Sequence, residues 1–274
     1  MKSRYHEFLV EDIRSGDITS ELVVPEAEKA RAKIVCKERC VLAGVSDAAE
    51  VFGELGAKVT AQVEDGRHAE RGDVVLEAEG RARALLAGER LALNLIMRMS
   101  GIATQTDLLV HKCQRINPKV RIAATRKTTP GFREFEKRAV MLGGGDPHRY
   151  GLDDAILIKD NHITIAGGIK EALQRAKKGS FTKKIEIEVQ NLKEARLAVE
   201  NGADIVMLDN FTPEMAKATA AELRKMRPAI LLEVSGGITP GNAEEYAEAA
   251  DIISLGALTH SYKSIDFSMD IARA

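Results

Sequence analysis

The chain contains little cysteine, no marked excess of charge of either sign and no long apolar segment. Lys and Arg total 40 while Asp and Glu total 41, which leaves a formal net charge of -1. Such a balance argues against a protein that coats nucleic acid or binds an anionic membrane through a basic surface. Cationic side chains that matter for function are therefore expected to act locally.

Only three cysteines occur among 274 residues, an odd and sparse set that is typical of a reduced, cytoplasmic protein. Cys36 and Cys40 could form half of a metal site, but no second Cys/His pair follows at a matching spacing. We interpret them as small hydrophobic residues that flank the end of a strand.

Targeting and membrane-spanning segments are not expected. The first ten residues lack the apolar core of a signal peptide. The most apolar helical stretch, residues 84–99, is interrupted by Glu89, Arg90 and Arg98, which excludes a membrane span. With 45% apolar residues, the chain can bury the core of one large domain or of two smaller ones.

The first hundred residues predict a mixed α+β domain. A short amphipathic helix is expected before a turn at residues 15–20, and a strand pair within residues 29–45. Ser46-Asp47 can cap a helix that runs to Leu55. Alternating segments at 58–63 and 74–78 predict antiparallel strands, and two helices are expected at 83–99 and 102–116.

From residue 119 onward, short apolar segments alternate with helical patterns. Strands are predicted at 120–125, 155–158, 185–189, 205–208, 230–234 and 252–255, and helices at 132–142, 163–177, 192–201, 213–226 and 242–249. Such alternation indicates βαβ crossovers and a parallel sheet. Six strands favour an α/β barrel with fewer than the usual eight. A doubly wound open sheet is the alternative, although no G-x-G-x-x-G opens the first unit.

Each of the six predicted strands ends in polar or glycine residues. In α/β barrels, catalytic and binding residues lie at these carboxyl ends of the strands. Cationic groups follow the first two strands and their connection, in Arg126-Lys127, His148-Arg149 and Lys159. The next two strands carry carboxylates: Glu186 and Glu188, which lie two apart on one face of a strand, and Asp209. The last two strands end in Ser235-Gly236-Gly237 and Ser254-Leu255-Gly256.

Each of these three groups has a chemical preference. Arginine binds carboxylates or diphosphate in bidentate fashion, and carboxylates suit ribose hydroxyls or Mg²⁺. Exposed backbone N–H groups near helix N-termini suit a terminal phosphate. Together they indicate a phosphorylated sugar that meets a second anionic group. His162 is interpreted as a helix-capping or packing residue, whereas His260 could either line the site or end the barrel.

The same residues carry a resemblance to a known family that extends over nearly the whole chain in the family's order. The chain resembles quinolinate phosphoribosyltransferases, also called nicotinate-nucleotide pyrophosphorylases (carboxylating). The matching stretches are Glu11-Asp12 with 16–19, Gly88-Glu89-Arg90, 100–104, 125–131, 143–145 with His148-Arg149, 157–162, 186–189, 208–210, 235–238 and 256–260. One departure is Asp146-Pro147 before His148, where many members have Asn next to the His.

The resemblance implies a type II phosphoribosyltransferase architecture: an N-terminal α+β sandwich-like domain (1–103), an incomplete six-strand α/β barrel (104–261) and a tail (262–274) that packs back on the first domain. It implies a homodimer, or an assembly of dimers, in which Arg90 of one subunit reaches the other subunit's barrel. The implied reaction joins quinolinate to phosphoribosyl diphosphate with Mg²⁺, giving nicotinate mononucleotide, diphosphate and CO2 in de novo NAD biosynthesis.

Roles for the site residues follow from the same resemblance. Lys127, Lys159, Glu188 and Asp209 are expected to be catalytic, with Glu188 and Asp209 meeting Mg²⁺ directly or through water. Substrates are expected to contact Arg90, Thr125, Arg126, Lys127, His148, Arg149, Lys159, Glu188, Asp209, Ser235, Gly236, Gly237, Ser254, Leu255, Gly256 and His260.

Three other functions stay open. Lys159 could form a Schiff base in a class I aldolase. A related phosphoribosyltransferase could use nicotinate or a metal-cofactor precursor as acceptor. A non-catalytic relative could keep the pocket without turnover.

Overall fold

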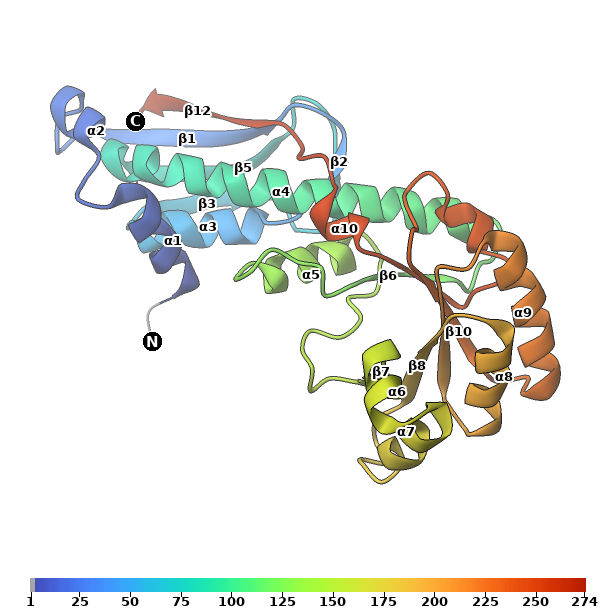
Figure 1. Cartoon of the computed structure of the whole chain (residues 1–274). Helices are drawn as coiled ribbons and strands as arrows, with labels where there is room; N and C mark the ends of the chain where they lie inside the picture. The colour runs from blue at the N-terminus through green and yellow to red at the C-terminus, as the bar shows by residue number, and fades with distance from the viewer. Residues whose placement is uncertain (1–2) are drawn as a thin grey trace. The chain divides into compact units, whose positions relative to one another are not determined.

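The computed structural model describes residues 3–274, which divide into two compact units. The first unit comprises the described part of Met1–Gln105 together with Tyr262–Ala274, and the second comprises Thr106–Ser261. Helix α4 (Ala82–Gln114) contributes residues to both units (Figure 1). Within residues 3–274 no helix is long and apolar enough to cross a membrane.

The first unit is built on a four-stranded antiparallel sheet. β1 (Lys29–Cys36) pairs with β5 (Val74–Arg81) on one side and with β12 (Phe267–Arg273) on the other, and β3 (Lys58–Gln62) pairs with the outer edge of β5. Buried alanine, isoleucine and cysteine alternate with exposed lysine and arginine along β1, as expected for a sheet with one covered face. Helix α3 (Val45–Glu54) packs on β3 and β5.

The predicted strand pair within residues 29–45 is wrong. β2 (Cys40–Val41) pairs with β4 (His68–Ala69) instead, because both edges of β1 are already occupied. Cys36 and Cys40 are buried at these strand ends, as predicted. Burial raises the pKa of both thiols.

Two short-range predictions near the N-terminus also differ from the structure. After helix α1 (Arg4–Ile13), the predicted turn at 15–20 continues into helix α2 (Ile18–Val23), whose first turn is capped by Asp17. The N-terminus of α3 is not capped by Ser46-Asp47 side chains. Asp65 accepts the N–H groups of residues 45 and 46 from a distant loop.

Residues 83–116, predicted as two helices, form most of the single helix α4. Gly101 is not a break. A Cβ at this position would lie 2.3 Å from the carbonyl oxygen of Lys263, so the glycine is required by the close approach of the C-terminal segment rather than by a turn. Sequence alone does not show which chain segment approaches.

The second unit confirms the incomplete barrel. Its six strands pair only in parallel, in the order β6-β11-β10-β9-β8-β7, so the first strand pairs with the last and the others follow chain order. A doubly wound sheet would instead change direction within the order. The strands are β6 (Arg121–Ala124), β7 (Ile156–Ile158), β8 (Ile185–Val189), β9 (Ile205–Asp209), β10 (Leu231–Ser235) and β11 (Ile252–Leu255).

The seam of the barrel lies between β6 and β7, which do not pair with each other in the described part of the chain. Asp146, in the connection between them, forms an isolated parallel bridge with Ala123 of β6. Its N–H donates to Ile122 and its carbonyl accepts from Ala124. The connection therefore lies along the free edge of β6.

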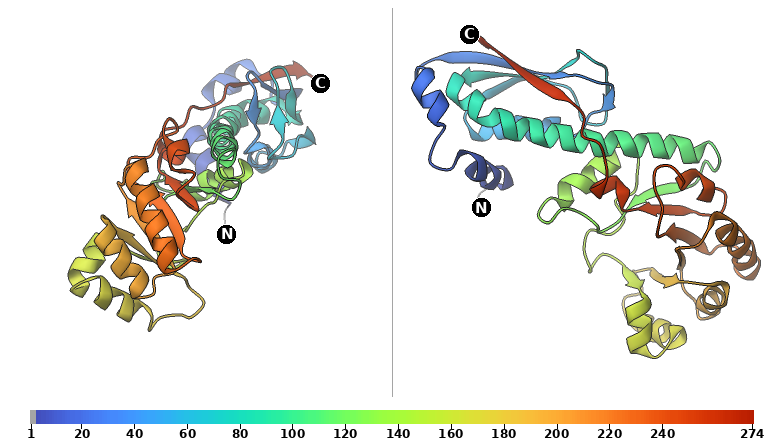
Figure 2. Two further views of the ribbon diagram at one scale, coloured as in Figure 1. Left: turned by 90° about the vertical axis from the view of Figure 1, so that its right-hand side faces the viewer. Right: turned by 45° about the horizontal axis from the view of Figure 1, so that its top comes forward.

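Helices α7 (Ile169–Ala176), α8 (Leu192–Glu200) and α9 (Pro213–Met226) follow one another along the outer side of the sheet (Figures 1 and 2). The predicted helix at 163–177 is divided by Gly167 and Gly168, which have φ values of 92° and 142°. The predicted helix at 242–249 is reduced to a short 3-10 segment. The helical elements are α5 (Arg133–Leu142), α6 (Asp160–Ala166), α7 (Ile169–Ala176), α8 (Leu192–Glu200), α9 (Pro213–Met226), η1 (Ala243–Tyr246) and α10 (Ala257–His260).

Candidate active site

A cavity of about 320 Å³ opens at the carboxyl ends of the barrel strands. It collects predicted site residues from all six strand ends and from the β6–β7 connection. The polar residues that line it are Thr125, Arg126, Lys127, His148, Arg149, Lys159, Glu188, Asp209, Glu233, Ser235, Gly236 and Ser254, and the apolar ones are Ala124, Leu157 and Met207.

One wall of the cavity is cationic. The loop after β6 is held by its own hydrogen bonds, since Lys127 N–H donates to the hydroxyl of Thr125 and Thr128 N–H donates to the carbonyl of Arg126. The Nε atom of Arg126 is buried and has no hydrogen-bond partner within residues 3–274. Buried donors are rarely left unsatisfied, so this nitrogen is available to a ligand.

Arg149 faces the same space. Burial, followed by the neighbouring charge of Arg126, lowers the pKa of its guanidinium. Two guanidinium groups that repel each other in a partly dehydrated space favour an anion between them. This wall therefore suits a ligand that carries more than one negative charge.

The backbone of His148 adopts a left-handed conformation with a φ of 52°. Its N–H donates to Oδ1 of Asp146 at 2.6 Å, and Asp146 also forms an ion pair with Arg121. Asp146 is not among the described residues that line the cavity. Asp146, which departs from the family pattern, thus stabilises this loop from outside the cavity.

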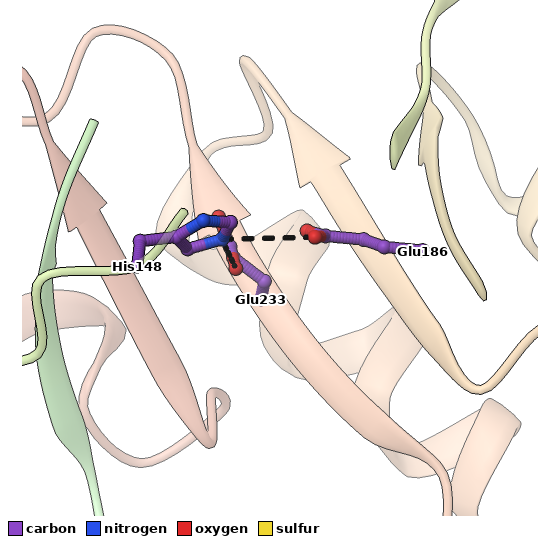
Figure 3. A group of neighbouring side chains, drawn as sticks. All are labelled: His148, Glu186 and Glu233. Atoms are coloured by element: carbon purple, nitrogen blue, oxygen red, sulfur yellow. Dashed lines mark hydrogen bonds and ion pairs between the residues drawn. The ribbon is translucent and has the colours of Figure 1, made fainter. Parts of the chain in front are cut away.

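His148 points toward two glutamates, Glu186 of β8 and Glu233 of β10 (Figure 3). Its Nε2 lies 3.2 Å from Oε2 of Glu233 and 3.6 Å from Oε2 of Glu186. Glu233 and Glu186 are only 1% and 3% exposed. Burial, followed by the charge of Glu233, raises the pKa of Glu186.

This group of three side chains does not fit a metal ion, although its ligand atoms lie within 4.8 Å of one another. Nδ1 of His148 accepts the N–H of Arg149 at 2.8 Å, which places the ring proton on Nε2. A protonated Nε2 donates to a carboxylate and cannot ligate a metal. His148 is thus fixed as a hydrogen-bond donor toward Glu233.

The opposite wall carries carboxylates. Nζ of Lys159 donates to Oε2 of Glu188 at 2.6 Å. Asn210 donates to Oδ2 of Asp209 at 2.6 Å. Burial, followed by the charge of Glu188, raises the pKa of Asp209. Each carboxylate retains one oxygen outside these bonds, and oxygen ligands of this kind suit Mg²⁺ or ribose hydroxyls.

The third part of the cavity is formed by small residues. Gly236 has a φ of 82°, and a Cβ there would lie 2.5 Å from Oδ1 of Asn210. Only glycine fits this turn without displacing the neighbouring side chains. Ser254 lines the cavity, and its buried hydroxyl has no partner in the part of the chain that the structure describes.

Several predicted site residues are not among the described residues that line the cavity: Gly237, Leu255, Gly256 and His260. The side chain of Leu255 is fully buried. A Cβ on Gly256 would meet His260 and Lys127, and His260 itself lies 2.7 Å from the hydroxyl of Ser261. Arg90 is exposed on α4 in the first unit.

His162 caps α6, as predicted, by accepting the N–H of Lys159 at 2.9 Å. Glu233 is absent from the predicted site residues. Glu186, predicted with Glu188 and Asp209 as one of the carboxylates, is not among the described residues that line the cavity. Each of Glu233 and Glu186 is a buried charged residue between two apolar neighbours, Leu232 and Val234 in β10 and Ile185 and Ile187 in β8. A buried ionisable residue of this kind is a general signal for a functional site.

Comparison with known proteins gives matches along nearly the entire chain. Residues 17–100 match the family model "Quinolinate phosphoribosyl transferase, N-terminal domain", and residues 102–270 match the corresponding C-terminal domain. A "Probable nicotinate-nucleotide pyrophosphorylase [carboxylating]" of Methanocaldococcus jannaschii is 50% identical, covering 96% of this chain and 94% of that protein. The human nicotinate-nucleotide pyrophosphorylase [carboxylating] is 39% identical over 91% of this chain and 84% of its own length.

Solved structures agree with these matches. The nicotinate-nucleotide pyrophosphorylase of Francisella tularensis superposes with a TM-score of 0.91 at 40% identity, covering 98% of this chain and 94% of that one. NadC of Streptococcus pyogenes superposes with a TM-score of 0.92 at 36% identity, covering 98% and 95%.

Proposed function

Because the chain belongs to the quinolinate phosphoribosyl transferase family, we propose that it transfers phosphoribosyl from 5-phosphoribosyl 1-diphosphate to quinolinate with decarboxylation. The products are nicotinate mononucleotide, diphosphate and CO2, and the enzyme is a pentosyltransferase of NAD biosynthesis. The observation that carries this proposal is that guanidinium groups, carboxylates and a serine–glycine turn line one common cavity.

The cationic wall is assigned to quinolinate, a dianion with adjacent carboxylates. Arg126 and Arg149 bind these carboxylates, because each guanidinium can donate two parallel hydrogen bonds to a planar anion. The Nε of Arg126, which has no hydrogen-bond partner among residues 3–274, supports this assignment. His148 borders the same site, with Lys127 and Lys159 beside it. Arg90 of a second subunit completes the clamp in the proposed homodimer, which can assemble further into higher oligomers.

The carboxylate wall is assigned to the ribose. Glu188 and Asp209 would accept hydrogen bonds from its hydroxyl groups and would hold Mg²⁺, directly or through water. Their ligand chemistry fits a magnesium ion, since both offer carboxylate oxygens, and burial followed by the charge of Glu188 raises the pKa of Asp209. When bound, Mg²⁺ neutralises charge on the leaving diphosphate.

The 5′-phosphate is assigned to the turns that follow β10 and β11, Ser235-Gly236-Gly237 and Ser254-Leu255-Gly256. Two observations support this assignment: the hydroxyl of Ser254 has no hydrogen-bond partner among the described residues, and Gly236 forms a left-handed turn. Both offer donors to an anion. Leu255 takes part through its backbone, since its side chain is buried. Thr125, which lines the cavity, borders the phosphoribosyl group. A contact from His260 is expected only from the family resemblance.

The chemical step is displacement of diphosphate from the anomeric carbon by the pyridine nitrogen. Positive charge develops on the ribose ring as the diphosphate leaves, and the carboxylates of Glu188 and Asp209 stabilise it. Lys127 and Lys159 stabilise the departing diphosphate. The nitrogen then carries a positive charge, which stabilises the electron pair left on the adjacent ring carbon when its carboxylate departs as CO2. That carbon takes up a proton from water to give nicotinate mononucleotide. The protein's contribution to this second step is orientation and exclusion of water.

The alternatives fit the cavity less well. The ammonium of Lys159 is held by Glu188 at 2.6 Å, a contact that a Schiff-base lysine would have to give up. An acceptor with one carboxylate, such as nicotinate, would leave part of the Arg126–Arg149 wall unpaired.

The test is an assay of purified protein with phosphoribosyl diphosphate, Mg²⁺ and a panel of acceptors: quinolinate, nicotinate and nicotinamide. Nicotinate mononucleotide is expected from quinolinate, with the other two acceptors at least about a hundredfold poorer in kcat/KM. Equal or better use of nicotinate would contradict the dicarboxylate assignment. Tight binding of quinolinate without any product would instead identify a non-catalytic relative.

A further inference from the structure

Helix α5 directs two cationic side chains at the loop that carries the His148–Arg149 pair. Arg133 and Lys137 lie four residues apart, which places them on the same face of the helix. Nη1 of Arg133 donates to the carbonyl of Tyr150 at 2.8 Å, and Nζ of Lys137 donates to the carbonyl of Pro147. These two carbonyls flank the His148–Arg149 pair on either side.

Arg133 also contacts the other cationic loop of the cavity. Its Nε donates to the hydroxyl of Thr128 at 2.9 Å, and the N–H of Thr128 donates to the carbonyl of Arg126 at 2.9 Å. One guanidinium thus joins the loop of Arg126 to the loop of Arg149. The separation of the two guanidinium groups that would bind a dicarboxylate depends on this connection.

Lys137 is buried to an extent that is unusual for lysine, with no exposed surface. Burial, followed by the charge of Arg133, lowers its pKa to about 8. Its Nζ lies 5.5 Å from the centre of the Tyr150 ring. Burying an amine is costly, and an apolar side chain of the same length would fill this space without that cost. We therefore assign the amine's role to its hydrogen bond with the carbonyl of Pro147.

That hydrogen bond acts next to a strained residue. The left-handed backbone of His148 is unfavourable for a side chain with a Cβ and persists only when its surroundings hold it. The N–H of His148 donates to the carboxylate of Asp146, and Lys137 donates to the carbonyl of the preceding Pro147. The orientation of the His148 and Arg149 side chains toward the cavity thus depends on residues that do not line it.

We propose that Arg133 and Lys137 form a positioning clamp that fixes Arg149 and His148 relative to Arg126, and that this clamp sets the affinity for the dicarboxylate acceptor. The inference rests on the proposed function. Neither residue is among the described residues that line the cavity. Lys137 acts through a backbone carbonyl, and Arg133 acts through a backbone carbonyl and the hydroxyl of Thr128.

The test compares Lys137→Met, which keeps the length but removes the donor, with Lys137→Gln, which keeps a donor without charge. Lys170→Met, at an exposed position on α7, is the matched control. For each variant, KM for quinolinate, KM for phosphoribosyl diphosphate and kcat are measured, together with the Kd of quinolinate by calorimetry. Circular dichroism and Tm confirm folding.

Lys137→Met is expected to raise KM and Kd for quinolinate about tenfold or more, the loss of one buried hydrogen bond. KM for phosphoribosyl diphosphate should change less than about twofold, because Lys137 bonds the loop of His148 and Arg149, whereas the proposed contacts of phosphoribosyl diphosphate lie at the strand ends themselves. Lys137→Gln should recover part of the loss, and Lys170→Met should match the wild type. Should Lys137→Met not fold, Arg133→Lys, which cannot serve both Thr128 and Tyr150, is expected to show the same selective loss.

A folded Lys137→Met with unchanged quinolinate affinity would overturn the clamp while leaving the proposed function intact. An equal rise of both KM values would do the same, because it would indicate a general structural role. Failure of the wild type to bind or turn over quinolinate would defeat the proposed function itself and the clamp with it.

Discussion

Lys159 and Glu188 form an ion pair of 2.6 Å between neighbouring strand ends of the barrel. Lys159 follows β7, and Glu188 lies near the end of β8. In the proposed reaction, Lys159 faces the leaving diphosphate and Glu188 faces the ribose. The pair therefore links the two charges that develop in the transition state.

This link predicts non-additive effects. Lys159→Met and Glu188→Gln should each lower kcat/KM for phosphoribosyl diphosphate, and in a double-mutant cycle their effects should differ from additivity by about 1–2 kcal/mol. The exposed pair Lys217–Glu248, at 2.8 Å, offers a matched control cycle with no expected effect on activity. Strict additivity for Lys159 and Glu188 would show that the two residues act independently.

Removal of the Arg126 guanidinium should weaken the acceptor site. Arg126→Ala is expected to lower kcat/KM for quinolinate by about 10²–10³-fold, or several kcal/mol of transition-state binding, because a charged hydrogen-bond partner is lost. Arg196→Ala, which removes an exposed pair with Glu222 on α8 and α9, is the control and should leave activity unchanged. Unaltered quinolinate kinetics in Arg126→Ala would show that the carboxylate clamp is wrongly assigned.

Gly236 should not tolerate a side chain. Gly236→Ala places a Cβ 2.5 Å from Oδ1 of Asn210 in a left-handed turn, so Tm should fall and KM for phosphoribosyl diphosphate should rise. Gly53→Ala, in helix α3 with open space around its Cβ, should instead keep or slightly raise Tm. Steady-state kinetics and thermal melting of the two variants check this. Normal phosphoribosyl diphosphate kinetics in Gly236→Ala would exclude this turn from the phosphate site.

Lys137 should make stability depend on pH. In the folded protein its pKa is lowered to about 8, whereas the unfolded chain has the ordinary value near 10.5. Between these values the unfolded state binds more protons, so stability rises with pH as the cost of the buried charge disappears. Wild type should therefore gain stability relative to Lys137→Met between pH 8 and pH 10.5. Denaturant unfolding at several pH values measures this difference, and a constant difference would mean that Lys137 titrates normally.

The strand–helix rhythm of the second unit could be predicted because each strand is a short apolar segment buried on both sides. The errors fall where partners distant in sequence decide the local structure. Gly101 looks like a break until Lys263 is placed against it, and α3 receives its cap from Asp65. Gly167 and Gly168 were a local signal, because two consecutive glycines with positive φ end a helix.

The cavity could be predicted for the same reason as the barrel: parallel strands bring their carboxyl ends to one mouth. The supporting residues could not. Glu233 lies two residues before the carboxyl end of β10. Its contact with His148 depends on the path of the β6–β7 connection. Arg133 and Lys137 lie on a helix whose rotation against the barrel is set by packing.

The most direct measurement uses quinolinate labelled with ¹⁴C in the carboxylate next to the ring nitrogen. The proposed reaction predicts that labelled CO2, diphosphate and nicotinate mononucleotide appear in equal amounts, and that no label is released without phosphoribosyl diphosphate. Release of diphosphate without CO2, or of CO2 without phosphoribosyl diphosphate, would contradict it.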